Sequence, residues 1–118
     1  IMFVGDVAFT QKDYGPGKSN HDLTTIVTIQ WDSNGNGVAD GGDSPVGQAT
    51  VTVELCHPGS GQCWDWIPLS TSGAGTANFI LKRAPTGNYD FTVNGVSHGT
   101  YLWESSLDLD NPSSYSLN

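Results

Sequence analysis

Short stretches in which apolar and polar residues alternate recur about every ten residues, and Gly, Asn, Asp, Ser or Pro separates them. Alternation with a period of two places successive side chains on opposite faces of a β-strand, and regular turn signals between such strands are typical of a β-sandwich. The pattern predicts no helix of ordinary length. The predicted strands cover Met2 to Phe9, Thr24 to Trp31, Gln48 to Cys56, Cys63 to Leu69, Thr76 to Lys82, Asn88 to Val96, Thr100 to Glu104 and a short segment near Tyr115.

The same alternation predicts which side chains form the core. A chain of 118 residues supports one hydrophobic core, so residues 1–118 are expected to form a single domain. We expect an all-β antiparallel sandwich whose inward rows come from both sheets. These rows are Val27, Ile29 and Trp31; Ala49, Val51, Val53 and Leu55; Ala77, Phe79 and Leu81; and Tyr89, Phe91 and Val93.

Composition narrows the classes of function. Twelve acidic residues against four basic ones give a net charge of −8, and a surface of this sign repels phosphate backbones and anionic lipids. No apolar run approaches the length of about 18 residues that a membrane-spanning helix needs. We therefore expect neither a nucleic-acid partner nor membrane insertion.

The chain has two cysteines, Cys56 and Cys63, on either side of a turn-forming run that contains Pro and Gly. No second Cys or His pair is present to complete a zinc site, so a disulfide is the better interpretation. Disulfides persist in oxidising compartments, and this predicts a secreted protein found outside the cell or at its surface.

If the two cysteines face each other across a hairpin, residues equally distant from them along the chain also face each other. Trp64 and Trp66 then join the core, and the disulfide lies on the outer face. The alternation offers no reason why two carboxylates should be neighbours there. The predicted cross-strand pairs are Leu55 with Trp64, Glu54 with Asp65, and Val53 with Trp66.

The segment Asp32 to Asp43 predicts a calcium site. It places oxygen ligands at positions 1, 3, 5, 9 and 12 of a twelve-residue loop, with Gly at position 6 and a backbone carbonyl at position 7. This is the spacing of an EF-hand loop, although strands flank it and position 12 is Asp. The alternative is a flexible loop rich in Asn, Gly and Asp. The predicted Ca²⁺ ligands are Asp32, Asn34, Asn36, Val38 through its carbonyl, Asp40 and Asp43.

Other candidate groups favour structural roles. Asp108 and Asp110, with Asn111, form either a surface turn or a second metal site. The run Gly95 to Gly99 matches G-x-S-x-G, but a nucleophile elbow requires a strand that enters a helix, with an acid and a base later in the chain, so we expect a turn.

Two histidines outside the Gly95 to Gly99 run lack the partners that catalysis needs. His21 and His57 are expected in loops, without a carboxylate or cysteine arranged for general-base chemistry. No catalytic constellation is therefore predicted, and the chain is not expected to be an enzyme.

Aromatic residues leave carbohydrate binding open as an alternative. Of Tyr14, Trp31, Tyr101 and Trp103, the alternation assigns Trp31 to the core. Tyr101 and Trp103 share a face of one predicted strand and are either a sugar-stacking platform or core residues.

A family resemblance covers most of the chain. The run Leu81 to Phe91 resembles the tyrosine corner of sandwich domains, and this assigns Tyr89 to that role. In order and spacing, several segments together resemble the immunoglobulin/fibronectin-like modules that end many secreted bacterial hydrolases, notably subtilisin-like proteases. They are Met2 to Val7, Thr25 to Ile29, Pro45 to Val53, Gly61 and Gln62 before Cys63, and Phe91 to His98.

The resemblance implies an immunoglobulin-like sandwich of about seven or eight strands in an extracellular setting. The chain departs from such modules in the long loop between Trp31 and Pro45, which is similar to the calcium loop of dockerins.

Two functions remain at this stage. The first is a non-catalytic, calcium-stabilised building block, a structural subunit of a fibre or a cell-surface assembly. The segment Ile1 to Val4 either completes the sheet of another copy by strand addition or forms the first strand of its own sandwich. The second is an accessory module of a secreted hydrolase that binds substrate or carbohydrate.

Overall fold

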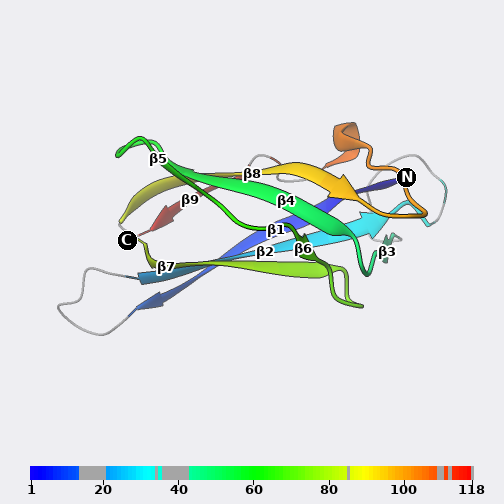
Figure 1. Ribbon diagram of the computed structural model, residues 1–118, viewed down its shortest axis with the longest axis horizontal. Coiled ribbons are helices and arrows are strands. Elements are labelled where there is room, and N and C mark those ends of the chain that lie inside the picture. The colour runs from blue at the N-terminus through cyan, green and yellow to red at the C-terminus, as the bar shows by residue number, and fades with distance from the viewer. Residues whose placement is uncertain are drawn as a thin grey trace.

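The computed structural model describes residues 1–13, 21–33, 35, 43–84, 86–108, 111 and 113–117. They form two sheets of antiparallel strands, and Figure 1 shows these sheets as the two layers of an elongated sandwich. The all-β sandwich predicted from the alternation is confirmed.

The first sheet is built around β2 (His21–Trp31). β1 (Met2–Asp13) pairs along one edge of β2, while β7 (Thr76–Ala84) and the short β3 (Ser44–Pro45) share the other edge. Because β3 pairs with the last two residues of β2, the long connection between these strands starts and ends at the same point of the sheet.

The second sheet has the order β5-β4-β8-β9, and the short β6 pairs with the start of β4. The predicted strand from Cys63 to Leu69 is therefore divided into two. The bounds are β4 (Thr50–His57), β5 (Gln62–Asp65), β6 (Leu69–Ser70), β8 (Gly87–Ser97) and β9 (Ser113–Leu117).

The predicted strand from Thr100 to Glu104 is wrong. This segment runs parallel to the start of β1 and makes one isolated bridge, between Met2 and Trp103. The Met2 amide donates to the Leu102 carbonyl at 2.7 Å, and the Glu104 amide donates to the Met2 carbonyl at 2.8 Å. The chain then turns into the 3-10 helix η1 (Ser105–Leu107), so the ladder cannot continue.

The core follows the predicted rows. All their residues are buried except Trp31 and Leu81, which are partly buried and pack at its margin. The register shifts at three places in the described strands: between Val4 and Asp6 in β1, between His21 and Leu23 where β2 pairs with β7, and opposite Thr52 and Val53 in β8. A bulge adds one residue to one strand, and this is why Val96, not Gly95, is buried in β8.

Aromatic side chains close both long margins of the sandwich. Phe9 of β1 stacks on Tyr115 of β9 with ring centroids 5.1 Å apart, and the Tyr115 hydroxyl donates to Gln11 Oε1 at 3.1 Å. At the other margin, Trp66 meets Phe79 of β7 edge-on at 5.7 Å. Trp66 lies beyond the end of β5, so the predicted pairing of Val53 with Trp66 is not part of the ladder.

Candidate functional site

The calcium loop predicted from Asp32 to Asp43 begins and ends at paired strands. Asp32 directly follows β2, and Asp43 directly precedes β3. Trp31 and Ser44 are register partners in the antiparallel ladder of β2 and β3. Asp32 is the next residue after this pair on one strand, and Asp43 is the residue before it on the other. The first and last predicted ligands therefore both adjoin the last register pair of this ladder, at the base of the loop.

The other predicted ligands, Asn34, Asn36, Val38 and Asp40, lie outside the described residues. The base itself is ordered by hydrogen bonds. The Ser44 hydroxyl donates to Ser33 Oγ at 2.9 Å, and the Asp32 amide donates to the Ile1 carbonyl at 3.1 Å. Ser33, at position 2 of the loop, thus contacts the start of β3 through its hydroxyl.

The Oδ1 atoms of Asp32 and Asp43 are both buried. A carboxylate oxygen that is removed from water needs a hydrogen-bond donor or a cation to compensate for the lost hydration. Carboxylate oxygens are also the ligands that a hard cation such as Ca²⁺ prefers. The base therefore holds two carboxylates with buried oxygens, at positions 1 and 12 of the predicted loop.

Asp108 lies at the centre of a hydrogen-bond network. Its Oδ1 accepts from the Val4 amide at 2.7 Å and from the Trp103 indole N–H at 3.0 Å, and its Oδ2 accepts from the Asn111 side-chain amide at 2.8 Å. Asn111 also pairs with both the amide and the carbonyl of Val93.

This network links β1 in one sheet to β8 in the other through two side chains. Of the two alternatives left open for Asp108, a turn or a metal ligand, the geometry favours a structural turn. Asp110 lies outside the described residues. The signal for the network in the sequence is Asn111 three residues after Asp108, which the alternation alone does not interpret.

The aromatic residues considered for sugar stacking pack within the molecule. Tyr101 stacks on Trp31 with ring centroids 5.2 Å apart and contacts the His98 ring at 5.0 Å. The Trp103 indole N–H is bonded to Asp108. Tyr14 lies outside the described residues. This arrangement favours packing roles for Tyr101 and Trp103.

The G-x-S-x-G run lies at the end of β8. The strand continues through Ser97, and a turn follows in which the Thr100 amide donates to His98 Nδ1 at 3.0 Å. Within the described part of the chain, no helix follows Ser97 directly, because η1 begins only at Ser105. The geometry needed for a nucleophile elbow is not formed there.

The expectation that His57 lies solvated in a loop is wrong. His57 is the last residue of β4 and is buried. Its Nε2 lies 3.0 Å from the Thr86 carbonyl oxygen and its Nδ1 lies 2.7 Å from Ser60 Oγ. A carbonyl only accepts, so Nε2 carries the hydrogen. Its burial depends on the approach of the β7–β8 turn, which no local pattern predicts.

Gly87 permits this approach. Its φ is +130°, and a Cβ at this position would lie 2.6 Å from His57 Nε2. His21 lies in β2 and not in a loop, and its side chain is outside the described part of the structure.

Tyr89 is completely buried and packs between the rings of His57 and Trp64, at centroid distances of 4.9 and 6.0 Å. Burial raises the pKa of its phenol from 10.0 to about 12. The tyrosine-corner hydrogen bond of its hydroxyl stays a prediction.

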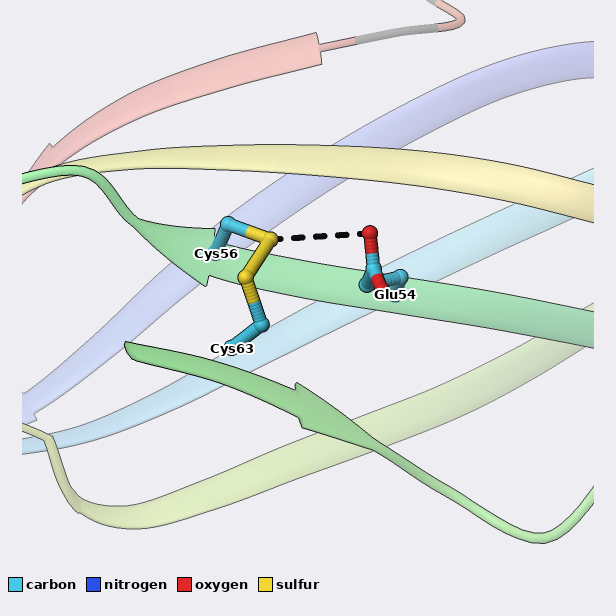
Figure 2. A group of neighbouring side chains, drawn as sticks. All are labelled: Glu54, Cys56 and Cys63. Carbon is cyan, nitrogen blue, oxygen red and sulfur yellow. Dashed lines mark hydrogen bonds between the residues drawn. A yellow bond between two sulfur atoms is a disulfide. The ribbon is translucent and has the colours of Figure 1, made fainter. Parts of the chain in front are cut away.

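The disulfide between Cys56 and Cys63 is present, and the predicted pairs Leu55 with Trp64 and Glu54 with Asp65 are confirmed. Figure 2 shows Glu54 beside this bond, with Oε1 3.6 Å from Cys56 Sγ. A disulfide sulfur carries no hydrogen, so the contact becomes a hydrogen bond only with the reduced thiol.

Among the described residues no helix is long and apolar enough to span a membrane. Comparisons with protein families, with curated proteins and with solved structures give no match.

Replacing Asp108 by Ala should lower the free energy of unfolding by about 3 kcal/mol, because it leaves the Val4 amide and the Trp103 N–H without their acceptor. Urea unfolding measures this change. Asp90→Ala is the control, since Asp90 is exposed and accepts one hydrogen bond, from Ser114. Equal losses in the two variants would contradict a special role for Asp108.

The raised pKa of Tyr89 predicts a loss of stability at alkaline pH. Below pH 10 the phenol is neutral in both states and its contribution is complete; as pH rises from 10.0 to about 12 the unfolded chain ionises first, and the stability falls. The total loss is about 3 kcal/mol.

Urea unfolding at a series of pH values between about 9 and 12, with only brief exposure to alkali, measures how the free energy of unfolding changes with pH. Tyr89→Phe should remove this part of the pH dependence, whereas Tyr101→Phe, at a partly exposed residue, should keep it. The same slope in wild type and Tyr89→Phe would refute the assignment to Tyr89.

Proposed function

We propose that this chain is a non-catalytic, calcium-stabilised, immunoglobulin-like building block that works outside the cell as a structural subunit of a fibre or surface assembly. The observation that carries the proposal is that Asp32 and Asp43 directly adjoin the register pair of Trp31 and Ser44, and that each has a buried Oδ1 atom.

The strand order supports the immunoglobulin-like assignment. Strands β1, β2 and β7 take the places of strands A, B and E in one sheet. Strands β4, β8 and β9 take the places of C, F and G in the other, with β5 as an additional edge strand beside β4.

Calcium supplies the charge that the base of the loop needs. The protein has a net charge of −8, and three carboxylates lie within the twelve residues from Asp32 to Asp43. A cation bound among them replaces repulsion with attraction. Since Asp32 and Asp43 extend β2 and β3, this attraction also holds the edge strand β3 to its sheet.

The disulfide supports an extracellular setting, because such bonds form and persist in oxidising compartments. The cross-link closes the hairpin between β4 and β5, at the opposite end of the sandwich from β3 (Figure 1). One end is thus fixed covalently, and in this proposal the other end is fixed by a metal ion.

The N-terminal segment places a condition on self-assembly. Met2, Phe3 and Val4 are buried in β1 and pair with β2 of their own chain. Strand addition by this segment therefore takes the form of an exchange, in which β1 of one copy occupies the same place in another copy.

Calcium should raise the midpoint of thermal unfolding by several degrees. A ligand that binds only the folded state at about 100 times its dissociation constant adds roughly 2.7 kcal/mol. The measurement compares melting curves in calcium and in chelator. Magnesium should substitute poorly, because it gives up its water ligands reluctantly.

Two variants separate metal binding from a general effect on the fold. Asp32→Ala should abolish the difference between calcium and chelator. Ser33→Ala should keep the difference between calcium and chelator. Loss of the hydroxyl contact with Ser44 should lower the midpoint of unfolding equally in both conditions. Identical curves in calcium and chelator for the wild type would refute the proposal.

Strand exchange predicts native particles larger than one chain. Deletion of residues 1–4 should reduce their mass to that of a monomer, because the exchanged strand loses its buried anchors. Deletion of Ile1 alone, which is 55% exposed and lies outside β1, should leave the particles intact. Light scattering on size-exclusion fractions tests this, and a monomeric wild type at high concentration would contradict the exchange.

A further inference from the structure

The hairpin of β4 and β5 carries a group of side chains that the proposed function does not use. Two neighbouring cross-strand pairs, Glu54 with Asp65 and Cys56 with Cys63, lie on its outer face. The disulfide alone would cross-link the strands, so cross-linking does not account for the carboxylates.

In the oxidised protein the two sulfurs are bonded to each other, and the Glu54 carboxylate lies beside them. The ligand atoms of Glu54, Cys56 and Cys63 lie within 4.8 Å of one another. Zinc binds sulfur at about 2.3 Å and carboxylate oxygen at about 2.0 to 2.2 Å, so tetrahedral ligands of these two kinds lie roughly 3.5 Å apart. Oε1 of Glu54 and Sγ of Cys56 are 3.6 Å apart (Figure 2).

We propose that reduction of the Cys56–Cys63 disulfide converts this group into a site for Zn²⁺, with two thiolates and the Glu54 carboxylate as protein ligands and water in the fourth position. Two molecules of a small thiol are oxidised to one disulfide as the bond between the cysteines is reduced to two thiols. Zn²⁺ then binds as both thiols lose their protons.

The ladder keeps the ligands together after reduction. Leu55 with Trp64 and His57 with Gln62 are the register pairs on either side of the cysteines, so the backbone still presents Cys56 and Cys63 on one face. In the reduced form, the negative charge of Glu54 repels a neighbouring thiolate. A divalent cation bound between them replaces this repulsion with attraction.

The site is selective by chemistry. Thiolates are soft ligands that suit zinc, whereas calcium requires six to eight oxygens. The turn of this hairpin and strand β3, which Asp43 directly precedes, lie at opposite ends of the sandwich (Figure 1). The two proposals therefore use different metals, and each can fail without the other.

The test uses the complete chain carrying Asp32→Ala, so that the loop does not compete for metal. The protein is reduced with an uncharged phosphine, and the reductant is then removed under anaerobic conditions. The reduced protein is titrated with Co²⁺, a spectroscopic substitute for zinc. We expect one cobalt per chain, the charge-transfer absorption of two thiolate ligands, tetrahedral d–d bands, and displacement by one equivalent of Zn²⁺. The oxidised protein should show none of these.

Glu54→Gln should weaken binding at least roughly tenfold, a loss that even an outer-shell group can cause. Asp65→Asn is the matched control: it removes the same charge from the same face, but Asp65 lies outside the group of three ligands, so its loss should be smaller. Cys63→Ser should remove the absorption of the second thiolate.

Several results would overturn the proposal. They are the binding of one metal ion by two chains, an equal loss of metal affinity in Glu54→Gln and Asp65→Asn, or the same cobalt spectrum from the oxidised protein. Circular dichroism monitors the fold throughout. If reduction unfolds the chain, zinc must restore the β spectrum in the reduced Asp32→Ala protein, and failure to restore it would also refute the site.

Discussion

Burial of alternate side chains between two sheets determines where the polar groups of this molecule lie. The inward rows of β2, β4, β7 and β8 leave one face of each strand for water or for polar contacts. Apolar burial is worth roughly 25 cal/mol per Å², so a slip of one residue in any central strand would cost many contacts. The registers that place Trp31 beside Ser44, and Glu54 beside Asp65, therefore follow from the packing of the core.

Charge then distinguishes the two ends of the sandwich. At one end, β2 and β3 bring two carboxylates with buried oxygens to the base of a loop rich in Asp and Asn. At the other end, two carboxylates lie beside a disulfide on an exposed hairpin. The protein has a net charge of −8, so the carboxylates at each end add to a field of one sign. Cations of different chemistry relieve the repulsion in both proposals.

Local patterns in the sequence predicted the features that depend on local geometry. The inward rows follow from alternation, and the pairing of Cys56 with Cys63 predicts the register of the hairpin around it. The strand expected from Thr100 to Glu104 failed because alternation cannot distinguish a strand in a ladder from a segment that makes a single backbone bridge, here between Trp103 and Met2.

The burial of His57 and the network of Asp108 were missed for a related reason. Each depends on a segment distant in the chain: the turn at Thr86 approaches His57, and the start of β1 approaches Asp108. Such contacts follow from tertiary packing and leave little trace in local composition. For the loop, the sequence predicts all six ligands, and the described structure supplies the arrangement of Asp32 and Asp43.

The central claim is that a calcium ion joins the two ends of the loop at its base. The most direct measurement is an experimental structure of the protein in calcium. The account predicts an ion bound by oxygens of both Asp32 and Asp43 at about 2.3 to 2.6 Å, with further oxygens from the loop between them. A structure in saturating calcium that has water, or no density, between these two carboxylates would contradict it.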